Sequence, residues 1–411
     1  MFTQVERIRK DIEKLSEFNR TPGKGLTRFS FTKEDRQARE YIEEKMKEAS
    51  LKVYEDPAGN IVGRRDGADN LPVVMIGSHF DSVKNGGNFD GNAGVVAGLE
   101  VARVLNERHI KTKYPMEFIA IVEEEGGRFG GTLFGSRAMV GKVSKDELEH
   151  FRDEDGISIA EAMQKFGFNP ANISKACRDP KTLKAFFELH IEQGPLLEAK
   201  QKDIGIVNAI VGIDWYEVEV IGKPDHAGTT PMNMRADALV LSSSVIQAVN
   251  KLAKESEEGA VATVGNMKVF PGATNIVPGK VLFTVDIRCQ NATVIKDIAH
   301  EINKVLKEKC NAQGLSYKME NKVSIPPVKL SERLIKILKQ KSKEIGLNYR
   351  QMVSGAGHDT MIMSEITDAS LVFVPSKNGR SHCPEEWTDY EQIRKGTELI
   401  LEAALDTAWV L

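Results

Sequence analysis

Residues 73–122 read VVMIGSHFDSVKNGGNFDGNAGVVAGLEVARVLNERHIKTKYPMEFIAIV: an apolar run, a glycine-rich turn, a helical pattern and a second apolar run. This alternation predicts a mainly parallel sheet flanked by helices. In open sheets of this kind, ligands bind outside the carboxyl ends of the strands. His79 follows the first predicted strand and Glu125 follows the second. Both side chains are therefore expected at the same edge of the sheet.

The predicted elements around this stretch continue the alternation. Thr32 is predicted to cap a helix that ends near Ser50, because Asp35 follows three positions later. Further predicted elements are the strands Lys52–Tyr54 and Asn60–Gly63, the helix Ala93–Glu107, a helix from Ser331, the strand Ala369–Val374 and a last helix capped by Thr388. We assign residues 1–211 and 328–411 to one α/β domain.

The pattern changes between about Gly212 and the pair Pro326-Pro327. The predicted strands and helices there are, in order, Trp215–Ile221, Ala236–Lys254, Ala262–Val269, Lys280–Arg288, Ala292–Asn311 and Ser316–Ser324. Their β-α-β-β-α-β order is that of the ferredoxin-like split motif. Residues 212–327 are therefore predicted to be an inserted α+β domain, and 411 residues are enough for two domains.

Composition excludes several classes of partner. Lys plus Arg number 56 and Asp plus Glu 59, without a long basic run, so neither a nucleic-acid groove nor an anionic membrane surface is expected. The four cysteines lack CxxC spacing, which fits reduced thiols in the cytosol. The amino-terminal MFTQVERIRKDIEKL lacks the apolar core of a signal peptide, and no stretch approaches the roughly 20 apolar residues of a membrane span. We expect a cytoplasmic protein with a small-molecule substrate.

Acidic and imidazole side chains recur in glycine-rich turns. His79 and Asp81 lie in GSHFDS, and Asp90 lies in NFDGNAG. A metal-bound histidine needs its second ring nitrogen held, and Asp81 could be that partner or could orient the site by another route. The FDGNAG turn has neither GxGxxG nor the GK[ST] ending of a phosphate-binding loop. Asp90, with two usable carboxylate oxygens, is better suited to bridge two metal ions.

Three successive acids, Glu123, Glu124 and Glu125, follow the apolar run 116–122. Repulsion among them is costly unless cations lie between them. Strand alternation would let adjacent residues take different tasks. We therefore assign Glu125 as a metal ligand and Glu124 as the general base, while the frame one residue earlier stays open.

Five of the eight histidines lie in glycine-flanked or acid-flanked motifs, namely His79, His190, His226, His358 and His382. One buried histidine alone is ordinarily explained by packing, but the joint pattern is hard to explain that way. Histidine and carboxylate ligands from separate strand ends are typical of two-metal sites. The residues indicate a two-metal hydrolase, and such ligands suit Zn, Mn, Co or Ni about equally.

Eight segments together resemble a known family. They are TRFSFTKEDRQAR, GSHFDSVKNGGNFDGNAG, EEGGRF with FGSRAMVG, ELHIEQGPLLE, HAGTTPMNMRADAL, NIVPG with VDIR, SGAGHD and GRSHCPEE. The chain resembles, over nearly its whole length, the amidase branch of the dinuclear metallopeptidase (M20) superfamily. Within that branch it is similar to the group of N-carbamoyl-L-amino-acid hydrolases, allantoate amidohydrolases and β-ureidopropionases.

The resemblance implies two divalent metal ions per subunit. The implied ligands are His79, Asp90, Glu125, His190 and His382. Asp90 would bridge the two ions, with His79 and His190 on one ion and Glu125 and His382 on the other.

The resemblance also implies roles for residues around the ions. Asp81 would hold His79, and Glu124 would be the general base. The inserted domain would serve as a lid and as the dimerisation domain of a homodimer, and His226 would stabilise the polarised carbonyl oxygen in its own site or in the partner subunit's site. The implied substrate-binding residues are Gln193, His226, Asn275, Arg288 and His358. Of these, Asn275 and Arg288 would grip a substrate carboxylate.

The expected activity is hydrolysis of the ureido group of an N-carbamoyl-L-amino acid to the amino acid, CO2 and ammonia. Allantoate is the second candidate substrate and 3-ureidopropionate the third, because all three combine a ureido group with a carboxylate. A peptidase or aminoacylase fits the motifs HIEQG and GRSHCPEE less well. A nucleotide-dependent oxidoreductase would need a phosphate-binding fingerprint, and a non-catalytic binding module would not need the base Glu124.

Overall fold

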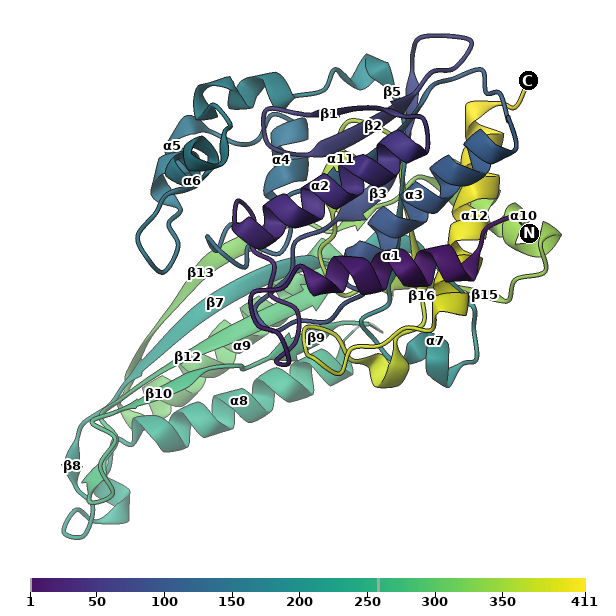
Figure 1. Ribbon diagram of the computed structural model, residues 1–411. Helices are drawn as coiled ribbons and strands as arrows, with labels where there is room; N and C mark the ends of the chain where they lie inside the picture. The colour runs from purple at the N-terminus through teal and green to yellow at the C-terminus, as the bar shows by residue number, and fades with distance from the viewer. Residues whose placement is uncertain (1, 257–258) are drawn as a thin grey trace. The chain divides into compact units, whose positions relative to one another are not determined.

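The computed structural model describes residues 2–256 and 259–411, which form two compact units. Unit 1 takes the described residues up to Asn208, together with Leu330–Met352 and Gly357–Leu411. Unit 2 takes the described residues of Ala209–Lys329 together with Val353–Ala356. The chain thus leaves unit 1 to build unit 2 and then returns (Figure 1).

A nine-stranded sheet has the strand order β1-β2-β4-β3-β5-β16-β6-β14, with β15 paired to β6. Its strands are β1 (Lys52–Glu55), β2 (Ile61–Arg65), β3 (Val73–His79), β4 (Met116–Ile121), β5 (Leu183–Ile191), β6 (Ile204–Ile210), β14 (Val328–Lys329), β15 (Tyr349–Ser354) and β16 (Ala369–Val374). The four central neighbours β4, β3, β5 and β16 run parallel. Their carboxyl ends therefore lie along one edge, as the alternation in residues 73–122 predicts.

The helices outside unit 2 are α1 (Val5–Glu17), α2 (Lys33–Glu48), α3 (Asn92–Glu107), α4 (Phe134–Met139), α5 (Lys145–His150), α6 (Ile159–Phe166), α7 (Leu196–Ala199), α10 (Glu332–Glu344), α11 (Asp359–Met363) and α12 (Tyr390–Ala408). Short 3-10 turns lie at Pro170–Ala176, Pro180–Thr182 and Lys377–Gly379.

Both faces of the central strands are covered, so these strands are buried along nearly their whole length and are mostly apolar. Every residue of β3 is buried. Met75 packs in a cluster with Met139 of α4 and Met363 of α11. Its neighbour Ile76 points to the other face, beside Gly98 of α3. A mainly parallel sheet between helices is confirmed as the fold of this part of the chain.

The two predicted helix caps differ in outcome. Thr32 accepts a hydrogen bond from the Asp35 N–H and is the N-cap of α2, as predicted. Thr388 is not a cap, because α12 begins at Tyr390 with Asp389 at its N-cap. The Thr388 hydroxyl instead donates to the carbonyl oxygen of Pro375. This threonine thus closes the loop between β16 and α12 instead of starting the helix.

Unit 2 contains a five-stranded antiparallel sheet of order β10-β12-β7-β13, with β9 also paired to β12. Its elements are β7 (Gly212–Ile221), β8 (Asp225–His226), the 3-10 turn Met232–Met234, α8 (Ala238–Glu255), β9 (Val261–Thr263), β10 (Met267–Phe270), β11 (Ile276–Val277), β12 (Lys280–Cys289), α9 (Ala292–Gln313) and β13 (Ser316–Ile325). Apart from the short strands β8 and β11, which form a separate two-stranded sheet, the elements follow the predicted β-α-β-β-α-β order, with β9 and β10 in the place of one predicted strand. The predicted strand Ala262–Val269 is in fact two short strands, because the regular strand conformation is interrupted at Gly265-Asn266. There the Asn266 carbonyl accepts a hydrogen bond from the Thr284 N–H.

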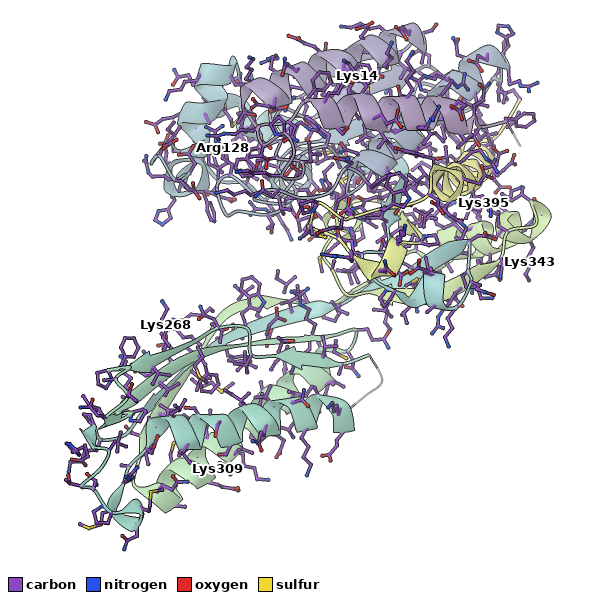
Figure 2. All side chains as sticks on the ribbon, turned by 60° about the horizontal axis from the view of Figure 1, so that its bottom comes forward. Lys14, Arg128, Lys268, Lys309, Lys343 and Lys395 are labelled. Atoms are coloured by element: carbon purple, nitrogen blue, oxygen red, sulfur yellow. The ribbon has the colours of Figure 1, made fainter. Side chains whose placement is uncertain are left out.

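The core of unit 2 lies between its sheet and the two helices α8 and α9 (Figure 1). Val218 and Phe283 of the sheet pack there with Leu241 of α8 and Ile302 of α9. Lys268 of β10 lies at the surface on the sheet side of the unit (Figure 2).

No helix within residues 2–256 and 259–411 is long and apolar enough to cross a membrane. The amphipathic helices lie on the sheets instead. α1, for example, buries Ile8, Ile12 and Leu15.

Candidate functional site

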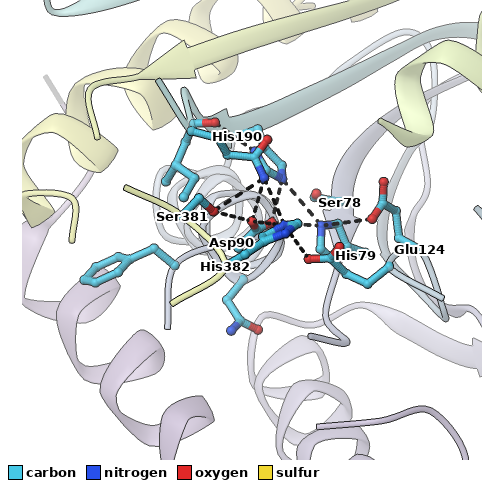
Figure 3. Close-up of polar contacts among 12 residues, drawn as sticks. Ser78, His79, Asp90, Glu124, His190, Ser381 and His382 are labelled. Carbon is cyan, nitrogen blue, oxygen red and sulfur yellow. Dashed lines mark hydrogen bonds and ion pairs between the residues drawn. The ribbon is translucent and has the colours of Figure 1, made fainter. Parts of the chain in front are cut away.

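The predicted metal ligands meet at the carboxyl edge of the parallel strands in unit 1 (Figure 3). His79 is the last residue of β3, and His190 is the penultimate residue of β5. Glu125 follows β4, Asp90 precedes α3, and His382 lies in the loop after β16. Ligands that are far apart in the sequence thus converge because parallel strands end at one edge.

Asp90 lies at the centre of this cluster. Its Oδ1 is 3.3 Å from His79 Nε2 and 3.1 Å from His190 Nε2, and its Oδ2 is 3.3 Å from His382 Nε2. His382 Nε2 is also 3.2 Å from Glu125 Oε1. Three groups of possible ligands each have all their ligand atoms within 4.8 Å of one another. They are Asp90 with His79 and His190, Asp90 with Glu125 and His382, and His79 with Glu124 and Glu125. The Asp90 carboxylate therefore belongs to both groups that contain two of the predicted ligands besides itself.

The local electrostatics favour added positive charge. Among the described residues, the buried oxygens Asp90 Oδ1 and Glu125 Oε1 have no hydrogen-bond donor. Burial alone would lower the pKa of His79, but the carboxylates of Glu124, Asp81 and Asp90 raise it well above its ordinary value. Asp90 and Glu125 raise the pKa of His382 to about 11. Divalent cations would supply the same positive charge without protons.

Glu124 is buried beside His79, with Oε2 3.8 Å from His79 Nε2. Burial, followed by the nearby carboxylates of Glu125, Asp359 and Asp81, raises its pKa well above the ordinary value. A carboxyl group with a raised pKa holds a proton more readily than an ordinary glutamate does. A bound cation would act in the opposite direction and lower this pKa.

Strand alternation is predicted to separate Glu124 from Glu125. This prediction is wrong, because β4 already ends at Ile121. The acids instead follow in a turn in which Glu123 has φ of 53°. Gln193 and His382 also have φ near 56°. Left-handed backbone at residues other than glycine is strained and is typical of functional sites. Glu124 lies next to His79 and Glu125 next to His382, and His79, Glu124 and Glu125 together also form a possible ligand group. The assignment of Glu124 as base and Glu125 as ligand stays a prediction.

Asp81 contacts more of the site than the sequence suggests. His79 Nδ1 lies 3.3 Å from the Asp81 backbone oxygen and 3.6 Å from its Oδ1. The two carboxylate oxygens accept hydrogen bonds from the backbone N–H groups of Glu124 (3.0 Å) and Glu125 (3.1 Å). Asp81 therefore joins the end of β3 to the turn after β4, besides facing the ring of His79.

The remaining predicted residues of unit 1 also lie here. His190 Nδ1 is 2.9 Å from the carbonyl oxygen of Ile191, which directs Nε2 towards Asp90. Gln193 Nε2 donates to Asp90 Oδ2 at 2.7 Å. The buried ring of His358 lies 4.5 Å from that of His190, and burial and the His190 ring hold its pKa well below the ordinary value. A ring with so low a pKa stays uncharged next to the cluster.

Two residues that hold Asp90 were not identified from the sequence. The Ser381 hydroxyl lies 2.9 Å from Asp90 Oδ2 and 2.8 Å from Glu386 Oε2. Glu386 Oε1 accepts the backbone N–H groups of Phe89 and Asp90. The backbone of Gly87 lies so close that an added Cβ would be 2.1 Å from Glu386 Oε1. The available signal was GRSHCPEE itself, since both residues belong to this motif.

His226 and Asn275 lie together in unit 2. Strands β8 and β11 pair His226 with Ile276, and the Ala227 N–H donates to the Asn275 carbonyl. His226 is exposed, and its Nδ1 accepts the backbone N–H groups of Gly228 and Thr229. A ring with Nδ1 as an acceptor carries its hydrogen on Nε2. His226 thus presents an N–H donor to its surroundings.

Arg288 lies near the end of β12. β8 lies beyond the start of β12, at the opposite end of the unit-2 sheet, as Figure 1 shows. Arg288 pairs with Ile213 at the start of β7, whereas Lys280 pairs with Ile221 at the end. At ~3.3 Å per residue, these two positions of β12 are roughly 26 Å apart. Arg288 donates from Nε and Nη2 to Asp286 and from Nη1 to the Gly355 carbonyl. One chain therefore does not bring Arg288 and Asn275 together.

Comparison with known proteins is consistent with this geometry. The family model "Peptidase family M20/M25/M40" matches residues 73–406. An N-carbamoyl-L-amino-acid amidohydrolase of Paenarthrobacter aurescens is 46% identical over 98% of each chain, and an allantoate amidohydrolase of Bacillus subtilis is 34% identical over 97% of this chain and 96% of its own. The crystal structure of a hydantoinase/carbamoylase family amidase from Burkholderia multivorans is 36% identical, with a TM-score of 0.91 over 99% of this chain and 98% of its own.

The match to the family model covers more than half of the chain, and the similarity to these amidohydrolases extends over nearly all of it. The chain therefore belongs to peptidase family M20/M25/M40, in its hydantoinase/carbamoylase amidase group.

Proposed function

We propose that this chain is a metal-dependent amidohydrolase that cleaves the ureido group of an N-carbamoyl-L-amino acid to the amino acid, CO2 and ammonia. The observation that carries the proposal is Asp90, whose two oxygens face His79 and His190 on one side and His382 on the other. The name of the Paenarthrobacter relative supports the choice of substrate.

The residues present fit two divalent ions, and Asp90 would be a ligand of both. Buried carboxylate oxygens without donors, next to imidazole nitrogens, are the ligand set of such ions. His79 and His190 would complete one site, and Glu125 and His382 the other. Cations bound there would supply Lewis acidity, which lowers the pKa of water and polarises a carbonyl group.

Glu124 is proposed as the general base. It would take a proton from the attacking water and pass it to the leaving nitrogen. Its burial next to His79 and its raised pKa suit a carboxylate that both accepts and returns a proton. Asp81 would hold the backbone of Glu124 and the ring of His79 in place.

Substrate binding is proposed for residues of both units. Arg288 would bind the carboxylate, because a guanidinium fork matches its geometry, and Asp286 would orient the fork until the substrate arrives. Gln193 and His358 would line the amide end of the pocket. His226 and Asn275, at the other end of unit 2 from Arg288, would act in the neighbouring subunit's site of a homodimer.

Ammonia release from N-carbamoyl-L-methionine, allantoate and 3-ureidopropionate tests this function. Each substrate is assayed with chelator-treated protein, and again after addition of Zn, Mn, Co or Ni. We expect turnover only with metal, and fastest on the N-carbamoyl amino acid. Faster turnover of allantoate would favour the second candidate, for which the Bacillus relative is the specific observation. Fastest turnover of 3-ureidopropionate would favour the third. Absence of turnover on all three, despite bound metal, would favour a non-catalytic binding module.

A further inference from the structure

Arg28 is a fully buried arginine beside the candidate metal ligands, with 0% of its surface exposed. Its guanidinium donates from Nε to the Phe80 carbonyl at 2.8 Å, from Nη1 to the Leu15 carbonyl at 2.6 Å, and from Nη2 to Asn92 Oδ1. All three acceptors are uncharged. Burying an arginine is unfavourable, so an arginine kept at this place calls for an explanation.

Two of the acceptors belong to the loops that carry metal ligands. Phe80 lies between His79 and Asp81. Asn92 accepts from Arg28 and donates from Nδ2 to the Asn88 carbonyl at 3.1 Å. Asn92 therefore closes the loop 88–92, which contains Asp90. Through its guanidinium, Arg28 connects the backbone of the His79 loop to the closure of the Asp90 loop.

The backbone of Arg28 strengthens the same connection. Its N–H donates to Ser82 Oγ at 2.8 Å, and its carbonyl accepts the Ser82 N–H at 3.1 Å. The backbone of Arg28 thus lies beside the loop 80–82, and its side chain extends past this loop to Asn92, the first residue of α3.

The charge and shape of the side chain both matter. Burial lowers the pKa of Arg28 to about 10, against the opposing effect of Asp35 and Asp81, so the side chain stays charged at neutral pH. A charged donor makes stronger hydrogen bonds than a neutral one. A planar fork can also reach three separate acceptors, whereas the ammonium group of lysine is a single point.

We propose that Arg28 is a positioning residue that sets the spacing between the His79 loop and the Asp90 loop, so that ligands from both loops can share one cation. The inference rests on the metal site of the proposed function. The hydrogen bonds of the Arg28 guanidinium go to Phe80, Leu15 and Asn92, so its proposed effect on the metal site is indirect.

Arg39 provides a matched control. It is also 0% exposed, and its guanidinium bonds to Asp35, to Glu55 and to the Gly59 carbonyl. Its guanidinium carbon lies 5.1 Å from the ring of Phe80, so it packs against the same loop. None of these three hydrogen bonds reaches the backbone of a ligand loop. Replacing Arg39 therefore disturbs a buried arginine without removing the connection.

The experiment compares full-length Arg28→Lys, Arg28→Met, Asn92→Ala and Arg39→Lys with the wild type. Zn2+ affinity of chelator-treated protein is measured by competition with a chromophoric chelator. Amide hydrogen exchange of peptides spanning residues 79–92 is followed in the metal-free state, and Tm is recorded for each variant.

We expect the Arg28 variants to raise the Zn2+ Kd by about 10- to 100-fold, the usual effect of losing a residue that orients metal ligands. Exchange over residues 79–92 should become faster. Asn92→Ala should change both quantities in the same direction, and it keeps the test valid should an Arg28 variant fail to fold. Arg39→Lys should lower Tm while changing Kd by no more than about 2-fold.

Arg28→Lys or Asn92→Ala with wild-type Zn2+ affinity and a Tm loss like that of Arg39→Lys would overturn the inference, because Arg28 would then act only on stability. This result leaves the proposed function standing. Wild-type protein that binds no divalent cation would instead contradict the proposed function, and the inference with it.

Discussion

The predicted site residues lie close together at the carboxyl edge of the unit-1 sheet, whereas those of unit 2 lie in two regions far apart. At the edge of unit 1, Asp90 gathers histidines from three different segments within 3.3 Å of its carboxylate. In unit 2, Arg288 lies at one end of the long strand β12, whereas Asn275 and His226 lie beyond the other.

The difference follows from the two kinds of sheet. Parallel strands all end at one edge, so residues far apart in the sequence converge there. Antiparallel strands alternate in direction, so residues that follow two neighbouring strands lie at opposite ends of the sheet. Unit 1 can therefore assemble a metal centre from one chain, whereas unit 2 offers two separate contact regions.

Glu124→Gln is expected to have the largest effect, and it tests the unit-1 side of this comparison. Loss of a positioned base should lower kcat by ~10²–10⁴-fold while the metal content stays unchanged. Steady-state kinetics and metal analysis measure the two quantities. The matched control is Glu123→Gln, which removes the neighbouring buried acid and should keep most of kcat. Loss of metal in Glu124→Gln, together with loss of kcat in Glu123→Gln, would show that the earlier frame is correct.

His226→Ala tests whether unit 2 serves a neighbouring chain. Removal of a hydrogen-bond donor to the polarised carbonyl should lower kcat by ~10²–10³-fold. Mixing this variant with Glu124→Gln under subunit exchange should restore about a quarter of wild-type activity, because about half the dimers are hybrids with one intact site. Differently tagged subunits verify that hybrids form. Confirmed hybrids without activity would show that His226 acts within its own chain.

Arg288→Ala tests the other end of unit 2. Loss of a charge-assisted fork should lower kcat/KM for carboxylate substrates by more than ~10-fold. Arg288→Lys should recover only part of this loss, because the ammonium group keeps the charge without the fork. An uncharged ureido analogue serves as the control substrate. An equal loss on that analogue would mean that the substitution damages the structure around Asp286 and Gly355 instead.

The pH dependence of metal binding tests the electrostatics of the unit-1 edge without a substitution. Burial opposes a raised pKa at His79 and His190, but neighbouring carboxylates raise the pKa of both rings. Asp90 and Glu125 raise the pKa of His382 to about 11, so the metal-free cluster holds protons at neutral pH, at His382 in particular. Binding must release these protons, so affinity is lost as the pH falls and gained as it rises. Kd should drop about 10-fold per pH unit for each proton released. Calorimetry in two buffers of different ionisation enthalpy counts the protons, and a count of zero would contradict the assignment of these rings as ligands.

Much of the fold could be predicted because its signals are local. Apolar runs such as 73–78 and the capping pair of Thr32 and Asp35 determine their elements almost by themselves. The prediction that Thr388 caps the last helix is wrong, because its hydroxyl donates to the Pro375 carbonyl instead. Only the folded loop brings these two residues together. The break at Gly265-Asn266 likewise depends on pairing with β12.

The candidate ligands could be identified from residue type and motif, but their supporting contacts could not. The hydrogen bonds of Asp81 to the turn after β4 depend on a left-handed backbone at Glu123, which no residue type signals. Arg28 lies in a recognisable motif, yet its three acceptors come from three distant segments. Nor could the sequence show that Arg288 lies at one end of β12 and Asn275 beyond the other.

We propose that the carboxyl edge of unit 1 is a two-metal site required for turnover. Metal content per chain, determined by elemental analysis alongside ammonia release on the same samples, tests it most directly. We predict two divalent ions per chain in the wild type, about one in His382→Ala, and loss of both metal and turnover on chelation. Full turnover in metal-depleted protein, or an unchanged metal content when Asp90 is replaced by alanine, would contradict the claim.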